Sequence, residues 1–133
     1  MKARSSVILG FCLLSGLLYC NPFDLNENVL LPVHNLEAPA TAAPNTAFTV
    51  TLTVEIGGCV SFNRIDVQRF AQGVRLIPLG TNASVRHPDA VCPSIIKEEA
   101  HDVLLDPPFA NPFQIYVEQG PGAPPVTTTV QIQ

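Results

Sequence analysis

The densest cluster of side chains able to do chemistry is the run "KEEAHD" at residues 97–102. If this run is a strand, Glu99 and His101 share one face, because side chains alternate with a period of two. A carboxylate and an imidazole on one face can ligate a metal such as zinc. No third ligand stands out in the sequence, and the alternative is a solvated outer face whose charges protect a sheet edge. Glu99 and His101 are therefore weak metal candidates, and no cofactor is expected.

Cysteines are the second group with chemical potential. Cys59 and Cys92 form an isolated pair in a chain that carries an export signal (see below), and such a pair most often forms a disulfide. The alternative is a free catalytic thiol, which needs a nearby cation or helix N-terminus to stabilise the thiolate. Nothing in the sequence next to Cys59 supplies one, and "HPDAVC" at 87–92 is no protease signature. We expect the disulfide and no catalytic residue.

The expected disulfide would fasten the long polar connection at residues 81–94. Gly57 and Gly58 precede Cys59, and glycines allow a strand to end in a sharp turn. Loops on a rigid scaffold often carry function, so Arg86, His87 and Asp89 are candidate binding residues. The alternative is a loop stapled only for stability or protease resistance.

The beginning of the chain has the pattern of a targeting segment. Lys2 and Arg4 precede the apolar run 7–18, which is short for a membrane span. The following "LLYC" resembles the lipobox of bacterial lipoproteins, although Tyr19 stands where that motif has a small residue. This resemblance implies a signal peptide at 1–19, lipidation of Cys20 and a tether at 20–28. The alternative is a plain secreted protein with an unmodified Cys20.

Composition narrows the class of partner. From Cys20 onward five basic residues remain against eleven acidic ones, a net charge of −6, and no basic run is present. Nucleic acid is therefore not an expected partner. Thirteen prolines, together with many threonines and valines, favour strands over helices.

Alternating apolar residues predict the strands themselves. The clearest run is 48–56, and further strands are expected at 30–39, 60–70, 74–80, 95–106, 111–120 and 126–133. The strand at 60–70 changes phase near Asn63 and Arg64, which predicts a bulge there. Residues 95–106 also have fair helix propensity, but prolines bracket them and we favour a strand. The predicted inward side chains are Phe48, Val50, Leu52, Val54, Ile56, Val60, Phe62, Ile65, Val67, Phe113, Ile115, Val117, Val126, Val130 and Ile132.

About seven short strands at regular spacing predict an all-β domain over residues 29–133. We expect a single antiparallel β-sandwich of immunoglobulin-like or fibronectin-type-III-like kind. "GGCVSF" at 57–62, a second cysteine some thirty residues later and "PFQIYVEQG" at 112–120 also carry a resemblance. The chain resembles small uncharacterised bacterial envelope proteins, lipoproteins or secreted, with one immunoglobulin-like domain. That resemblance implies a fold and a location but no activity.

These observations favour a non-enzymatic module outside the cytoplasm. The first hypothesis is a lipid-anchored β-sandwich that mediates binding or assembly at the cell envelope. Its partners would be the membrane, through the anchor, and an unidentified envelope component. The alternative is a secreted inhibitor or small-ligand carrier that uses the disulfide-stapled loop end. An enzyme is disfavoured because no catalytic constellation is visible.

Overall fold

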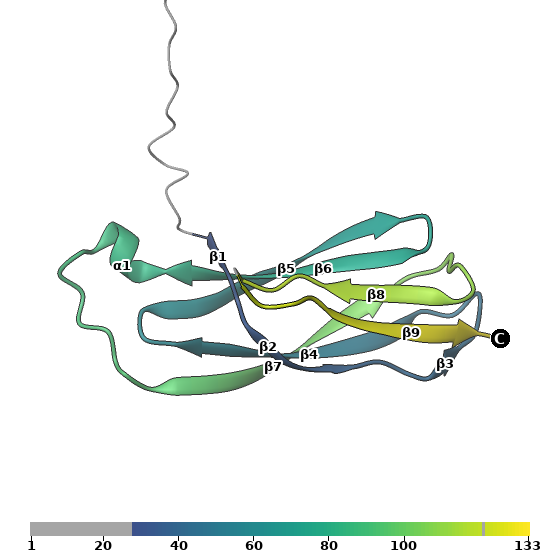
Figure 1. Cartoon of the computed structure of the whole chain (residues 1–133), viewed down its shortest axis with the longest axis horizontal. Helices are drawn as coiled ribbons and strands as arrows, with labels where there is room; N and C mark the ends of the chain where they lie inside the picture. The colour runs from purple at the N-terminus through teal and green to yellow at the C-terminus, as the bar shows by residue number, and fades with distance from the viewer. Residues whose placement is uncertain (1–27, 121) are drawn as a thin grey trace, which may run out of the picture.

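The computed structural model describes residues 28–120 and 122–133 (Figure 1). The signal peptide expected at 1–19 and Cys20 lie outside the described residues, as does the tether up to residue 27. Strands take up 60% of the described residues and helix 4%, which confirms the all-β prediction. Within the described part, no helix is long and apolar enough to cross a membrane.

The described chain contains nine strands and one helix of a single turn. In chain order they are β1 (Asn28–Leu30), β2 (Val33–Glu37), β3 (Thr41–Ala42), β4 (Phe48–Gly57), β5 (Val60–Phe70), β6 (Gly73–Asn82), α1 (Ala83–Arg86), β7 (Ile96–Leu105), β8 (Phe113–Val117) and β9 (Val126–Ile132). The segment expected as one strand at 30–39 contributes to β1 and β2, which pair with different strands. Residues 95–106 form strand β7, as favoured, and not a helix.

The strands form one mixed sheet that curls over at the turn between β4 and β5. The main path runs β2-β4-β5-β6-β8-β9-β3, with β1 beside β6 and β7 beside β4. β4 pairs with β7 along its whole length but with β5 only at Gly57 and Val60. The sheet therefore has two arms. Figure 1 shows the arm of β2, β4 and β7 below the arm that contains β5, β6, β8 and β9.

Two of the strand pairs are parallel, so the wholly antiparallel order expected from the sequence does not hold. β3 pairs with β9 in parallel, and β6 pairs with β8 in parallel. The β6–β8 pair has a simple physical cause. After β6 the chain crosses to the other arm, runs along β4 as β7, and comes back to start β8 in the same direction as β6. A crossover of this kind brings strands together in parallel.

The apolar core lies between the inner faces of the two arms. The buried apolar side chains are Leu31, Val33, Val50, Leu52, Val54, Val74, Leu76, Val103, Leu105, Phe113, Ile115, Val117, Val130 and Ile132. Fully burying side chains of this size contributes about 1.5–3 kcal/mol each before the entropy of ordering them is counted. Eight of the predicted inward residues belong to this set. Val67 was predicted inward but is exposed.

The predicted phase break in β5 is confirmed as a register irregularity. The pairing of β5 with β6 shifts between Phe62 and Arg64, which is the position that the change of apolar phase indicated. β5 is the outermost strand of its arm among the described residues, and bulges are common in such edge strands. The bulge allows both Phe62 and Ile65 to pack partly against the core.

Candidate functional site

The turn between β4 and β5 organises one end of the molecule. Gly58 has a φ of 62°, a left-handed conformation that glycine adopts without steric cost. A Cβ atom on Gly57 would lie 2.6 Å from the carbonyl oxygen of Ile95, so glycine is also needed for close approach. The two glycines therefore let the segment before β7 pack directly against the end of β4.

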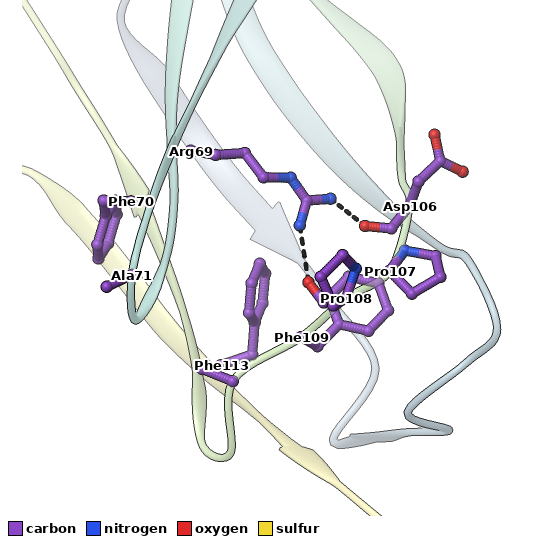
Figure 2. Close-up of a pocket in the computed structure, with 9 residues that line it drawn as sticks. Arg69, Phe70, Ala71, Asp106, Pro107, Pro108, Phe109 and Phe113 are labelled. Atoms are coloured by element: carbon purple, nitrogen blue, oxygen red, sulfur yellow. Dashed lines mark hydrogen bonds between the residues drawn. The ribbon is translucent and has the colours of Figure 1, made fainter.

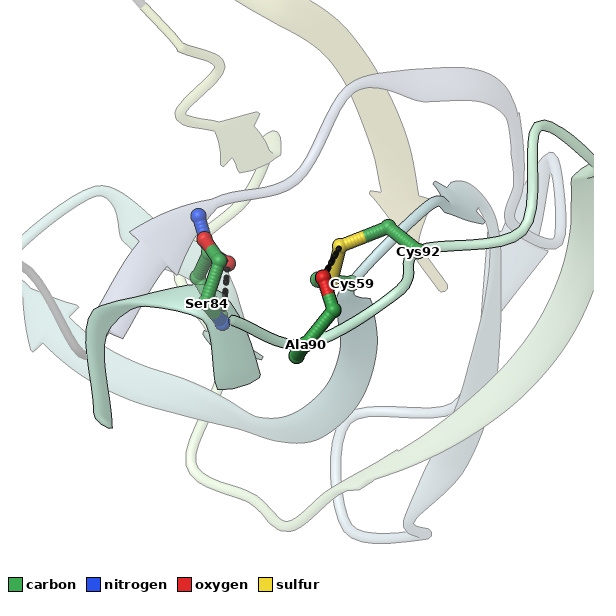
Figure 3. Close-up of a disulfide and its surroundings, with 5 residues drawn as sticks. Cys59, Ser84, Ala90 and Cys92 are labelled. Atoms are coloured by element: carbon green, nitrogen blue, oxygen red, sulfur yellow. Dashed lines mark hydrogen bonds between the residues drawn. A yellow bond between two sulfur atoms is a disulfide. The ribbon is translucent and has the colours of Figure 1, made fainter. Parts of the chain in front are cut away.

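The predicted disulfide between Cys59 and Cys92 is confirmed (Figure 3). The two Cα atoms are 4.8 Å apart, within the usual range for a disulfide. The bond joins the residue before β5 to the residues that lead into β7. It therefore fastens residues 83–95, which we call the stapled loop, to the β4–β5 turn.

Helix α1 is the only helical turn in the described chain, and it begins the stapled loop. Asn82 caps it, because its side-chain oxygen accepts hydrogen bonds from the backbone N–H of Ser84 at 3.1 Å and the hydroxyl of Ser84 at 2.6 Å. The N–H of Ala83 donates to the carbonyl oxygen of Cys59 at 2.9 Å. The loop is thus attached to the same turn at both of its ends.

The predicted binding residues lie in the exposed part of this loop. Arg86 ends α1, His87 is its C-cap, and Asp89 follows in the turn closed by the Ala90 N–H bond to the His87 carbonyl. All three are exposed on the outside of the loop. The structure places the three residues at the tip of the stapled loop, within four positions of one another.

Apolar side chains at the same end were not recognised as site residues from the sequence. Val85, Val91, Ile95 and Ile96 are all exposed, although Ile95 and Ile96 open a stretch that the pattern assigned to a strand. An apolar residue at the start of a strand can face the core or solvent, and the local pattern does not distinguish the two. The sequence feature that could have indicated this surface is the group of β-branched apolar residues on both sides of Cys92.

Glu99 and His101 share a face of β7, as predicted, but it is the inner face and not the outer one. They alternate with the same period as the core residues Val103 and Leu105. The Nε2 atom of His101 lies 3.4 Å from a carboxylate oxygen of Glu99 without hydrogen-bond geometry, and it has no hydrogen-bond partner. Among the described residues no group of three or more His, Cys, Asp or Glu side chains could hold a metal.

The ring of His101 instead packs on Phe62 of β5. The two ring centroids are 3.5 Å apart and the planes are 12° from parallel. This stack joins the edges of the two arms. His101 is therefore a packing residue in this structure, with one polar atom left unsatisfied.

A cross-strand ladder of charges on β2, β4 and β7 was not predicted. His34 Nε2 lies 2.6 Å from a Glu55 oxygen, and His34 Nδ1 lies 3.5 Å from a Glu98 oxygen. Glu55 and Glu98 are direct neighbours in the β4–β7 register. Like charges in that position repel, so His34 bridges an otherwise unfavourable pair.

The opposite end of the molecule carries an aromatic pocket of about 530 Å³, drawn in Figure 2. Arg69 donates hydrogen bonds to the carbonyl oxygens of Asp106 and, at 3.0 Å, of Pro108. Its guanidinium carbon lies 5.6 Å from the ring centre of Phe109 and 5.9 Å from that of Phe113. Arg69 therefore ties the end of β5 to the segment after β7. A lone arginine in an edge strand carries no sequence signal for this role.

A second pocket lies at the stapled end, with a volume of about 420 Å³. Its lining is mainly apolar and comes from β1, the end of β4 and the starts of β5 and β7: Val29, Leu30, Leu31, Pro32, Glu55, Ile56, Gly57, Val60 and Ile96. Its one carboxylate, on Glu55, is already paired with His34. The pocket suits an apolar group more than a charged one.

Comparison with known proteins does not assign a family. No family model matches the chain, and no curated protein and no solved structure matches it. The function must therefore be argued from the geometry described above.

Proposed function

We propose that this chain is a non-enzymatic binding or assembly module of the cell envelope, outside the cytoplasm, held to the membrane by a lipid on Cys20. The observation that carries the proposal is the stapled loop. It projects from a rigid all-β scaffold, and it is fastened by the Cys59–Cys92 disulfide. A disulfide suits an oxidising compartment. Exposed loops held in this way are common binding surfaces.

The proposal includes that the protein catalyses no reaction. The thiols of Cys59 and Cys92 are consumed in the disulfide, so neither is available as a nucleophile. His101 stacks on Phe62 and faces the seam between the arms. These contacts favour structural roles for the residues that would otherwise be catalytic candidates.

We also propose that the two arms correspond to the sheets of a sandwich of immunoglobulin-like or fibronectin-type-III-like kind. The arm of β2, β4 and β7 supports this, because all its pairs are antiparallel. The parallel β6–β8 pair is a departure from that topology. An experimental structure with a different order of strands in the β2–β4–β7 arm would contradict the assignment.

The binding role is tested by crosslinking the protein in intact cells and comparing two variants. The wild-type protein should form a crosslinked adduct with its partner. A triple variant of the stapled loop should not form it; this variant combines Arg86→Ala, His87→Ala and Asp89→Ala. The control is Arg64→Ala with Asp66→Ala, which removes one charge of each sign from an exposed pair on β5. Retention of the adduct in the loop variant would assign binding to another surface.

The anchor is tested separately by the mass of the intact protein after detergent extraction. A chain that begins at Cys20 and carries acyl chains supports lipidation. An unmodified Cys20 thiol would leave a secreted protein and remove the anchor from the proposal.

The second candidate function is a carrier of a small apolar ligand, and the pocket of about 420 Å³ at the stapled end favours it. Binding pockets for small molecules are concave and mainly apolar. Native mass spectrometry of the protein isolated from its own cells would reveal a retained ligand. Val60→Phe, which narrows this pocket, should remove that ligand, while Ala71→Phe at the opposite pocket should not.

A further inference from the structure

Exposed apolar side chains gather at the stapled end of the molecule. Seven large apolar side chains are exposed in the described part of the chain, and four of them lie within residues 83–96. Their exposed fractions are 42% for Val85, 96% for Val91, 61% for Ile95 and 68% for Ile96. Single exposed apolar residues are ordinary, but a group of them in the stapled loop and at the start of β7 is typical of a surface that another phase or molecule covers.

These side chains are presented by backbone that is held in place. Ala83 is hydrogen-bonded to Cys59, Cys92 is covalently bonded to Cys59, and Ile95 packs against Gly57. All the segments that carry the apolar residues are therefore fastened to one turn. The order of the loop is maintained by the fold, so little conformational entropy is lost when the apolar side chains become covered.

The N-terminal segment joins the domain at this same end. Asn28, the first described residue, pairs with Thr81, which lies two residues before α1. Its side chain also accepts a hydrogen bond from the Asn63 amide at 3.2 Å. The sequence before Asn28 contains the apolar run 7–18 and Cys20. A chain spans at most about 3.3–3.6 Å per residue, so an anchor at Cys20 keeps Asn28 within roughly 30 Å of the membrane.

We propose that the stapled end rests on the lipid bilayer, with Val85, Val91, Ile95 and Ile96 entering its interface. The inference rests on the proposed membrane attachment and adds the orientation of the domain. Arg86 and Lys97 flank the apolar residues, but Asp89 and Glu98 offset them. The surface therefore suits zwitterionic lipid, and its affinity comes from apolar burial and not from attraction to anionic headgroups.

The chain offers a clean reporter for this contact, because it contains no tryptophan. Val91→Trp in the full chain places a single indole on the stapled loop. The matched control is Leu104→Trp, a replacement of another exposed residue (63%) near the far end of β7. Both variants are reconstituted into phosphatidylcholine vesicles with and without brominated acyl chains, and flotation of the vesicles measures attachment.

The expected result is a blue-shifted Val91→Trp emission that loses more than half its intensity to brominated lipid. Leu104→Trp should keep a water-exposed spectrum and its intensity, and phosphatidylglycerol should not strengthen the effect. Attached protein whose Val91→Trp emission is unquenched overturns the orientation and leaves the anchor standing. A blue shift without quenching assigns the surface to contact with a second copy of this chain, and also overturns the orientation. Failure to float with the vesicles overturns the attachment itself.

Discussion

Phe62 of β5 and His101 of β7 stack face to face, with ring centroids 3.5 Å apart, at a place where no hydrogen-bonded ladder joins the described strands. β5 and β7 are both antiparallel to β4, so they run in the same direction along the edges of the two arms. The Cys59–Cys92 disulfide joins their starts, and Arg69 bonds the carbonyls that follow the end of β7. The edges of the two arms, β5 and β7, are therefore held together by side-chain contacts and not by backbone hydrogen bonds between these two strands.

The ring stack should contribute measurably to stability. Phe62→Ala removes a partly buried ring and its contact with His101, and we expect the free energy of unfolding to fall by about 2 kcal/mol. Val67→Ala on the same strand is the control, because Val67 is exposed and its loss should cost less than about 0.5 kcal/mol. Urea unfolding followed by circular dichroism measures both.

His101→Phe separates packing from polarity at the same stack. It keeps a ring on Phe62 and removes the Nε2 atom that has no hydrogen-bond partner in the described chain. Because an unsatisfied polar atom is costly to bury, the free energy of unfolding should stay equal or rise by about 1 kcal/mol. A loss of stability would show instead that the contact between His101 and Glu99 is favourable.

Arg69 should not be replaceable by lysine. Its planar guanidinium reaches two backbone carbonyls and lies over the rings of Phe109 and Phe113. Lysine is a point charge that cannot span both carbonyls, so Arg69→Lys should lower the free energy of unfolding by about 1 kcal/mol. Arg75→Lys is the control, because Arg75 lies over the single ring of Tyr116. Equal effects of the two substitutions in thermal unfolding would contradict the bridging role.

Strong local patterns made parts of this structure predictable. The alternation in 48–56 defined β4, and the change of phase after Phe62 located the bulge, because both depend on residues adjacent in sequence. The disulfide was predicted from an isolated pair of cysteines in a chain whose first residues have the pattern of a targeting segment. The face shared by Glu99 and His101 followed from the period of the strand.

Long-range pairing could not be predicted in the same way. Nothing local to β6 and β8 indicates that a crossover through β7 makes them parallel. Whether Glu99 faces inward and Ile96 outward depends on which side of β7 meets the other arm. The contacts of Arg69 with Asp106 and Pro108 span 37 and 39 residues and carry no sequence signal.

The charge ladder on β2, β4 and β7 should show coupling between His34 and Glu98. Glu55 and Glu98 repel in register, and His34 contacts both carboxylates. His34→Ala should therefore lower stability by about 0.5 kcal/mol at low salt, and by less when Glu98→Gln has removed the repulsion. A double-mutant cycle at low and high salt measures this. Additive effects, or effects independent of salt, would exclude a bridging role for His34.

The disulfide should contribute most of all the contacts tested, because it closes a long stretch of chain. Cys59 and Cys92 are 33 residues apart, and the chain-entropy relation gives about 3–4 kcal/mol for such a loop. Cys59→Ser with Cys92→Ser should lower the free energy of unfolding by that amount while leaving the β-sheet circular dichroism in place. The core between the arms contains neither cysteine, so the domain should lose loop order before it loses its strands.

Reduction of the wild-type protein provides an independent comparison with this double variant. Dithiothreitol should bring wild-type stability down to that of the variant and leave the variant unchanged. Hydrogen exchange should then rise in the stapled loop and at the Ala83 amide, which donates to the Cys59 carbonyl. Exchange that rises equally in β8 and β9 would mean that the bond supports the whole fold and not the loop. In that case the order of the stapled loop could not be changed without also destabilising the β-sheet that carries it.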